Sequence, residues 1–357
     1  MGRLCTFSCV ASPNAMRCRV HAAVFLGVCV CAALRGQTPP TITTTSTLVL
    51  VPVLVQSSSG DLAQVLQAQD FLLTDNGVAQ SVRLEDTERQ PLSIVVLLQT
   101  GGAAVEELPL YAKLDTMLGY LTANSPHQVA MVTFDSQPEF QWDFTPDVAD
   151  LDDGFTKPGP GDRGAAILDA VSHGIDMLSE QPPTQRRILI LISQSHDDGS
   201  HVRAEDIIRR LGENNITIEC LTFSPEKKWL KDEFTKPRHE NPLYQISPDQ
   251  PLLLHTFNLD RPLREALNAM RENTGGAIAG LSGGEAFSFD SKASLEQQLA
   301  LLANHFAATL TLSFRPTSKQ AGFHSLHVQV AGHPEMRVSA RSSYWAAAAP
   351  KDSPAAR

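Results

Sequence analysis

The chain has 357 residues, of which 42% are hydrophobic, 19% charged and 6% aromatic, and its formal net charge is −10. This length is enough for about two domains with a sizeable core, and the composition excludes collagen, coiled coil and wholesale disorder. The first 36 residues hold four arginines and no acid, so the rest has 25 basic and 39 acidic residues, a net charge of −14. A chain this acidic, without a basic run, is not expected to bind nucleic acid or anionic lipid.

Residues 1–36 predict a signal peptide for export. Arg17 and Arg19 precede an unbroken apolar run from Ala22 to Leu34. The run is shorter than the ~18–20 residues that a membrane span needs, so we expect cleavage behind it and a periplasmic or extracellular protein without an integral membrane segment. An uncleaved short anchor is the alternative. Residues 37–46 are rich in Thr and Pro, which is typical of an extended linker.

Residues 47–90 predict a small set of antiparallel strands. The first strand, at 48–55, contains Pro52, which favours an edge or a bulge. A second strand, at 69–77, ends in Asp-Asn-Gly, the strongest hairpin signal in the chain.

Residues 91–308 alternate between apolar strands and amphipathic helices. This alternation predicts an α/β fold in which helices cover both faces of a doubly wound, mostly parallel sheet. Gly212 is expected to cap the end of one helix, and the proline-rich stretch 224–262 is expected to be a loop insertion. The predicted strands are 93–98, 129–134 with its partner 140–144, 188–192, 216–223 and 286–289. The predicted helices are 105–122, 165–179, 202–212, 263–281 (interrupted at Gly275-Gly276) and 295–308.

Residues 309–346 return to strand alternation. We expect them to pack with residues 47–90, because neither segment alone has enough strands for independent stability. The tail at 347–357 is rich in Ala and Pro and is expected to be disordered. The predicted architecture is therefore an α/β domain with a small antiparallel β subdomain built from both chain ends.

A series of short motifs follows in fixed order between residues 48 and 345. In chain order they are Gln69-Asp-Phe71, Asp75-Asn-Gly77, Gly164-Ala-Ala-Ile-Leu-Asp-Ala170, Asp197-Asp-Gly-Ser200, Ser282-Gly-Gly-Glu285, Leu312-Ser-Phe-Arg-Pro316, Gly322-Phe-His324 and Ala340-Arg-Ser-Ser-Tyr-Trp345. Together they resemble the von Willebrand factor type A-related domain family that is named for acidobacteria. The resemblance implies a von Willebrand A-type, Rossmann-like domain flanked by strands from both chain ends.

The resemblance also implies where a divalent cation would bind. Members of the family usually hold it with an Asp-x-Ser-x-Ser loop, a Thr on a second loop and an Asp on a third. The first loop here is Gln99-Thr-Gly-Gly-Ala103, Ala165 stands at the Thr position, and Ser193-Gln-Ser195 replaces the third motif. Because hard cations need carboxylate oxygens and none remains, we expect a degenerate site that binds neither a divalent cation nor a cofactor.

We expect these loops to form the ligand face of an exported, non-enzymatic protein-interaction or adhesion-type module with a protein partner. The alternative is a structural or assembly role in the cell envelope, with contacts through the β subdomain or the 224–262 insertion. Ser, His and Asp are neighbours within 193–197, but adjacent side chains do not supply the geometry of a catalytic triad. Asp197 and Asp198 are expected to be solvated loop acids or a helix N-cap. The candidate ligand face consists of Gln99, Thr100, Gly101, Gly102, Ala103, Ala165, Gln194, Ser195, Asp197 and Asp198.

Overall fold

A computed structural model describes residues 48–63, 65–86, 90–112, 114–122, 125–223, 260–318 and 320–347. The predicted signal peptide, the linker, almost all of the 224–262 insertion and almost all of the predicted tail lie outside these residues. Within the described part of the chain, none of the helices combines the length and the hydropathy of a membrane span.

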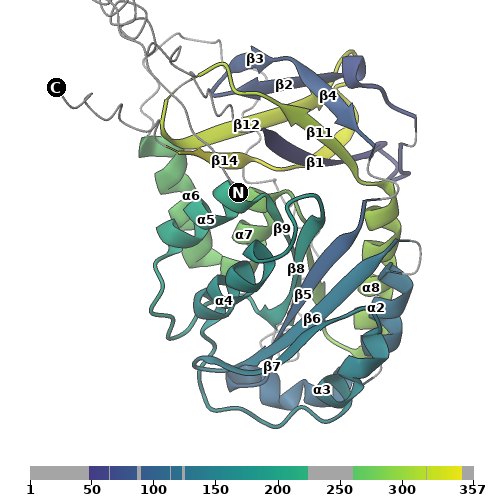
Figure 1. Cartoon of the computed structure of the whole chain (residues 1–357), viewed down its shortest axis with the longest axis vertical. Helices are drawn as coiled ribbons and strands as arrows, with labels where there is room; N and C mark the ends of the chain where they lie inside the picture. Colours follow the sequence, from purple (N-terminus) through teal and green to yellow (C-terminus); the bar gives the residue numbers. More distant parts are fainter. Residues whose placement is uncertain are drawn as a thin grey trace, which may run out of the picture. The chain divides into compact units, whose positions relative to one another are not determined.

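A six-stranded sheet forms the centre of the α/β part (Figure 1). The strands lie in the order β10-β9-β8-β5-β6-β7, and only β7 runs antiparallel to its neighbour. This is the doubly wound 3-2-1-4-5-6 order, in which the direction of winding switches between the first and fourth strands, here β5 and β8. The prediction of a mixed α/β fold with a mostly parallel sheet is confirmed. The bounds are β5 Leu92–Gln99, β6 His127–Phe134, β7 Pro138–Thr145, β8 Arg186–Gln194, β9 Ile216–Phe223 and β10 Ala286–Phe289.

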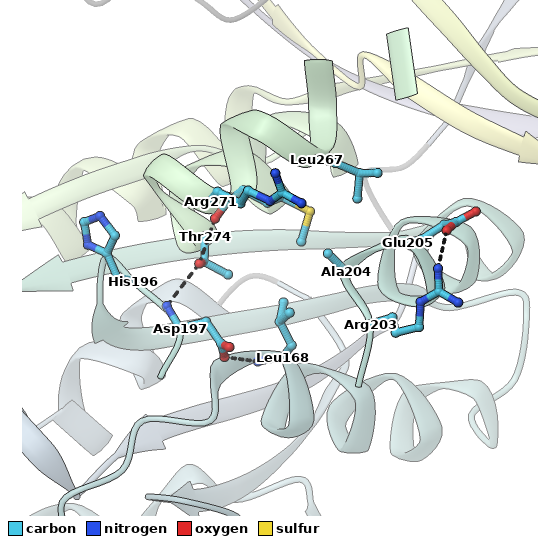
Figure 2. A pocket seen from close by; sticks show the side chains of 10 residues that line it. Leu168, His196, Asp197, Arg203, Ala204, Glu205, Leu267, Arg271 and Thr274 are labelled. Atoms are coloured by element: carbon cyan, nitrogen blue, oxygen red, sulfur yellow. Dashed lines mark hydrogen bonds and ion pairs between the residues drawn. The ribbon is translucent and has the colours of Figure 1, made fainter. Parts of the chain in front are cut away.

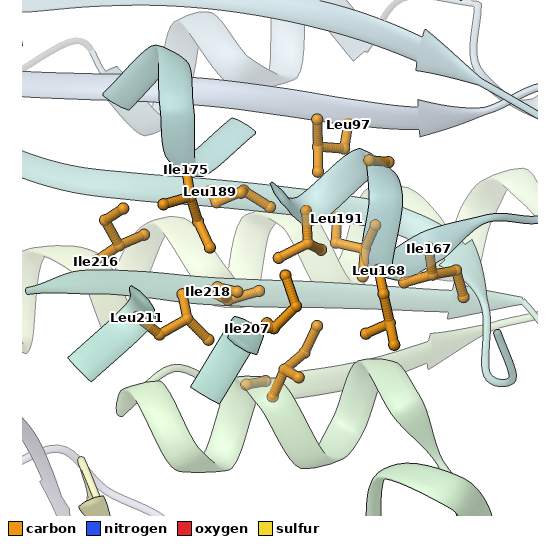
Figure 3. Close-up of a cluster of buried hydrophobic side chains, with 14 of the residues drawn as sticks. Leu97, Ile167, Leu168, Ile175, Leu189, Leu191, Ile207, Leu211, Ile216 and Ile218 are labelled. Carbon is orange, nitrogen blue, oxygen red and sulfur yellow. The ribbon is translucent and has the colours of Figure 1, made fainter. Parts of the chain in front are cut away.

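Helices cover both faces of this sheet. Every residue of β5 is buried, and because successive strand side chains point to opposite faces, Leu97 joins one core while Leu98 joins the other. Figure 3 shows the first core, in which Leu97, Leu189 and Leu191 of the sheet meet residues of α4 and α5. The helices are α2 Leu114–Thr122, α3 Asp152–Thr156, α4 Ile167–Ser179, α5 Ala204–Asn214, α6 Asp260–Glu272, α7 Thr274–Ser282 and α8 Lys292–Ala308.

Two four-stranded antiparallel sheets are built from strands of both chain ends, in the orders β13-β1-β11-β4 and β14-β12-β2-β3. Their apolar side chains share a third buried cluster. The hairpin predicted at Asn76-Gly77 is present between β2 and β3, with both residues at positive φ, 48° and 82°. The bounds are β1 Val49–Gln56, β2 Phe71–Asp75, β3 Val78–Gln80, β4 Val82–Glu85, β11 Leu310–Phe314, β12 Gly322–Val330, β13 Arg337–Ala340 and β14 Ser343–Ala346.

Arg341 and Trp345 attach these sheets to helix α5. Arg341 is only 2% exposed, and its guanidinium donates to the carbonyls of Leu211 and Gly212 at 3.2 and 3.1 Å. A Cβ on Gly212 would lie 2.5 Å from the backbone nitrogen of Trp345. The prediction that Gly212 caps the helix is wrong: α5 continues to Asn214 and is capped by Asn215 at φ 51°, and the glycine serves the close approach of Trp345.

Two predicted helices are also divided. The prediction of one helix over 105–122 is wrong: short 3-10 turns occupy Gly102–Glu106 and Leu108–Leu110, and α2 begins only at Leu114. Proline at 109 explains the break, because it lacks a backbone donor and disfavours a helical residue before it. The predicted helix over 263–281 breaks at Asn273, two residues before the glycines. There the side chain accepts a hydrogen bond from Gly276 at 2.8 Å and starts α7 as an N-cap.

Candidate functional site

The winding switch between β5 and β8 is closed by two glutamine side chains. Gln99 is completely buried. Its Oε1 accepts a hydrogen bond from the backbone nitrogen of Gln194 at 2.8 Å, and its Nε2 donates to the Gly101 carbonyl at 2.9 Å and to Gln194 Oε1 at 3.2 Å. We call this arrangement of Gln99 and Gln194 the amide clasp. It occupies the place where ligands enter an open doubly wound sheet, at the carboxyl ends of the strands.

The third loop, which begins with Ser193-Gln-Ser195 at the end of β8, is held by its own polar groups. Gln194 Nε2 donates to the His196 carbonyl at 2.8 Å, and Ser195 Oγ shares a hydrogen bond with His196 Nδ1 at 2.7 Å. The Ser195 carbonyl accepts from the backbone nitrogen of Thr274 at 2.8 Å, which ties the loop to the start of α7. Gln194 and Ser195 are half-buried and His196 is exposed, so these residues present polar groups to solvent on a loop that is already held in place.

The first loop lies against the loop that precedes α4, backbone to backbone. Gly102 donates to the Asp162 carbonyl at 2.7 Å, and Gly161 donates to the Thr100 carbonyl at 3.0 Å. A Cβ on Gly101 would lie 2.4 Å from the Cβ of Asp135 and 2.8 Å from the Asp162 carbonyl oxygen. Any side chain at position 101 would therefore force the two loops apart.

Asp135 and Asp162 fasten the second loop to the end of β6. Asp135 is buried and accepts from the backbone nitrogen of Asp162 at 2.9 Å. Asp162 in turn accepts from the backbone nitrogen of Gly164 at 2.7 Å and from that of Ser136 at 3.1 Å, and its hydrogen bond with Ser136 lowers the pKa of Asp162. The negative charge of Asp135 raises the pKa of the neighbouring Glu139. The sequence argument did not find these acids. The position of Asp135 directly after a buried strand was the available signal.

The two acids that follow β8 have different roles. Asp197 Oδ1 accepts hydrogen bonds from the backbone nitrogen of Leu168 at 3.0 Å and from Ser200 Oγ at 2.5 Å, so this carboxylate caps the start of α4 from a neighbouring loop. Asp198 is exposed. Its backbone forms an isolated bridge with the buried Ala165, with hydrogen bonds of 3.1 and 2.9 Å. Asp198 is therefore the solvated loop acid that the sequence predicts. The N-cap alternative is wrong, because the N-cap residues of α4 and α5 are Ala166 and Arg203.

These loops do not fit the divalent cation that the family resemblance implies. The Gln99 amide hydrogen-bonds to protein groups through both its oxygen and its nitrogen. Position 101 has no room for a hydroxyl, and the Asp197 carboxylate is bound to α4. Within the described ranges, no three His, Cys, Asp or Glu side chains are grouped so that they could hold a metal ion. A hard cation needs anionic oxygens in exchange for its water, and the positions that the resemblance assigns to ligands, residues 99, 101, 103, 165 and 194, carry no carboxylate.

The structure brings the ten predicted residues together on three adjoining loops, but it divides them by exposure. Gln99, Thr100, Gly101 and Ala165 are buried and serve the closure of the loops. We define the exposed loop face as the candidate residues that reach solvent without a capping role, which are Gly102, Ala103, Gln194, Ser195 and Asp198.

A hollow of about 480 Å³ lies beside the third loop. Figure 2 shows it between the starts of α4 and α5 and the α6-α7 corner. Several charged groups that line the hollow already have partners. Arg203 forms an ion pair with Glu205 at 3.0 Å, and the Asp197 carboxylate accepts a hydrogen bond from the start of α4. The backbone nitrogen of Asp197 donates to Thr274 Oγ1 at 3.1 Å on the far wall. The hollow therefore extends the surface next to the exposed loop face and is lined in part by His196 and Arg271.

A buried ionisable cluster joins β9 to α8. Glu219 is 7% exposed and accepts from the backbone nitrogen of Glu285 at 2.7 Å. Burial raises the pKa of Glu219 to about 8. The Glu285 carboxylate contacts His305 Nδ1 at 2.6 Å. This cluster lies away from the loops and bears on stability.

No protein-family model matches the chain, and no curated protein matches it. Among solved structures, it is similar to an aerotolerance-related membrane protein from Bacteroides fragilis, at 14% identity over 60% of this chain and 98% of that one, with a TM-score of 0.38. It is also similar to the conserved hypothetical protein BatB from Bacteroides thetaiotaomicron, at 14% identity, 60% and 99% coverage and a TM-score of 0.36. A third likeness is to the PilB minor pilin from Streptococcus sanguinis, at 12% identity, 62% coverage of each chain and a TM-score of 0.39. Likenesses this distant assign no function.

Proposed function

We propose that the chain is an exported, non-enzymatic protein-interaction module of von Willebrand A type, whose ligand face is the exposed loop face. The amide clasp carries the proposal. It fills the winding switch with hydrogen bonds between protein groups, at the position where a cation-dependent relative would hold its metal. The ordered motifs and the 3-2-1-4-5-6 strand order support the fold assignment.

The polar groups near the clasp favour binding over catalysis. Ser195 and His196 share a hydrogen bond of 2.7 Å, which resembles a nucleophile and its base. The next acid, Asp197, turns its carboxylate to the start of α4 instead of to the imidazole. A base that no third group orients is a poor general base, so we propose a surface for recognition rather than for hydrolysis.

The chemistry of the exposed loop face suits a protein partner that binds without a metal bridge. Gly102 and Ala103 are half-buried and carry no charge, and Gln194 and Ser195 offer neutral hydrogen-bonding groups. Because the loops are held by internal hydrogen bonds, little ordering entropy should be lost when a partner docks. Binding is expected to be the same in EDTA and in millimolar Mg²⁺.

The test starts with residues 38–357 immobilised and exposed to an envelope fraction, with and without EDTA. The captured partner is purified, and its affinity is measured for the native chain and for Asp198→Arg and Ser195→Arg, whose side chains take no part in the amide clasp. Gln329→Arg, at an exposed position of β12, is the matched control.

We expect both loop variants to weaken binding at least about tenfold, or ~1.4 kcal/mol, and the control to bind like the native chain. Binding that EDTA abolishes would refute the proposal. Loop variants that bind as tightly as the native chain would favour the structural or assembly role instead.

A further inference from the structure

The six-stranded sheet ends in a long edge strand. β7 has eight residues and pairs only with β6, in antiparallel orientation (Figure 1). On its other side, no strand of the described part of the chain adds to the sheet. Such an edge presents a row of backbone donors and acceptors that can pair with another extended chain.

Aromatic side chains accompany this edge. Phe140 is 64% exposed, although burial of a phenyl ring away from water is favourable. Trp142, two residues on, packs against the core on the α2 side of the sheet. An apolar side chain on an added strand would cover Phe140 and extend this cluster.

The surroundings of β7 are strongly acidic. Between residues 135 and 162 there are eight acids and one base, a net charge of −7, which is half of the −14 that remains without the first 36 residues. On the strand itself, Gln141 Nε2 donates to Asp143 Oδ1 at 3.1 Å, and its Oε1 contacts His173 of α4 at 2.9 Å. The eight acids are Asp135, Glu139, Asp143, Asp147, Asp150, Asp152, Asp153 and Asp162, and the base is Lys157.

The charge pattern argues against a second copy of this chain as the occupant. If two copies of β7 paired antiparallel about Gln141, Glu139 of each would lie opposite Asp143 of the other. Like charges opposite one another destabilise a strand pair. The same charges would attract an extended segment that is basic.

We propose that the β7 edge binds an extended, basic segment of another protein by strand addition. Alternate Lys or Arg side chains of that segment face Glu139 and Asp143, and its apolar side chains cover Phe140. Backbone hydrogen bonds supply affinity, and the charges select the partner. The inference concerns a surface other than the exposed loop face and holds whether or not that face binds anything.

The probe is a fluorescein-labelled peptide of four Lys-Val repeats, which has the eight-residue length of β7. Its affinity for residues 38–357 is measured by anisotropy in about 0.15 M salt. Two further peptides carry N-methyl groups on all Lys or on all Val residues, which removes the backbone donors of one edge and keeps the charge. We expect the unmodified peptide to bind and one methylated peptide to bind at least about tenfold more weakly. No binding by the unmodified peptide, or equal affinity of all three, would overturn the proposal.

Charge variants of the chain distinguish binding of the peptide at β7 from a non-specific attraction of the basic peptide to an acidic protein. The first double variant carries Glu139→Lys and Asp143→Lys on β7. The control double variant carries Asp152→Lys and Asp153→Lys, which make the same change of charge on the exposed side of α3. We expect about tenfold weaker binding only for the β7 pair. Equal losses for both pairs would show charge attraction alone and overturn strand addition.

Two measurements guard against misfolding and self-association. Phe140→Ser adds no charge and leaves the buried cores untouched, and we expect it to weaken binding several-fold with an unchanged melting temperature. Hydrogen exchange on the native chain should show the peptide protecting amides within residues 138–145. Protection of amides elsewhere would refute the inference. Sedimentation that shows a dimer of the native chain, and a monomer of the variant with Glu139→Lys and Asp143→Lys, would also refute it.

Discussion

Replacing Gln99 by methionine tests whether the amide clasp holds the two switch-point strands together. The two side chains are similar in length and volume, so the change removes hydrogen bonds from a completely buried residue while it largely preserves packing. The three groups that lose a hydrogen bond to Gln99 do not lose the same amount of free energy. The Gly101 carbonyl keeps the hydrogen bond from Ala104 at 3.0 Å, and Gln194 Oε1, on a half-buried side chain, can turn to water. The backbone nitrogen of Gln194 loses Gln99 as its acceptor.

One backbone donor that loses its acceptor costs about 1–3 kcal/mol. We therefore expect Gln99→Met to lower the free energy of unfolding by that amount and the melting temperature by about 2–4 °C for each kcal/mol. The assays are urea unfolding and hydrogen exchange at the Gln194 amide, which should exchange faster in the variant. Gln329→Met on the exposed side of β12 is the control and should stay within about 0.5 kcal/mol of the native chain. If Gln99→Met unfolds like this control and the Gln194 amide stays protected, the clasp does not close the switch point.

Three further outcomes are expected. Millimolar Mg²⁺, Mn²⁺ or Ca²⁺ should leave the melting temperature as it is in EDTA. A site filled at about 100 times its Kd would add ~2.7 kcal/mol, so a clear rise would mean that other acids bind the ion. Arg341→Met should cost about 3 kcal/mol or more in urea unfolding, because carbonyls at the end of α5 lose their donor, and a loss below 1 kcal/mol would contradict this reasoning. Burial raises the pKa of Glu219 from 4.5 to about 8, so the folded state holds a proton that the unfolded chain releases. Stability should therefore fall by up to ~1.4 kcal/mol per unit as the pH rises from 5 to 8. Glu219→Gln should flatten this slope, and an unchanged slope would assign it to other groups.

Those parts of the fold that local patterns determine were predictable from the sequence. The apolar run of β5 indicated a strand buried on both faces, and Asn76-Gly77 indicated a hairpin because both residues tolerate positive φ. Gly212 shows the limit of this reasoning. A glycine near a helix end is typical of a cap, and only the approach of Trp345, from a distant part of the chain, shows that it serves packing instead.

The candidate site was predictable in the same partial way. Its loops follow strands that are adjacent in the sheet, so their residues meet at one edge, as the ordered motifs implied. The sequence also shows directly that no carboxylate stands at the positions that the family resemblance assigns to cation ligands. The hydrogen bonds of Gln99 to Gln194 were not predictable, because they join the Gln99 side chain to the backbone and side chain of a residue 95 positions away in the sequence.

For the proposed ligand face, the closure of the loops matters more than the lack of carboxylates at the positions that the family resemblance implies. A serine at position 101 would place its Cβ 2.4 Å from that of Asp135, so a hydroxyl side chain at this position would separate two loops that are in backbone contact. An aspartate at position 99 would bring a buried anion close to the Gly101 carbonyl, which now accepts a hydrogen bond from the Gln99 amide. Restoring the ligands one at a time would thus break the packing before it built a cation site. The exposed loop face is held in one arrangement by the protein's own hydrogen bonds, and a partner that recognises it meets a surface formed without a metal.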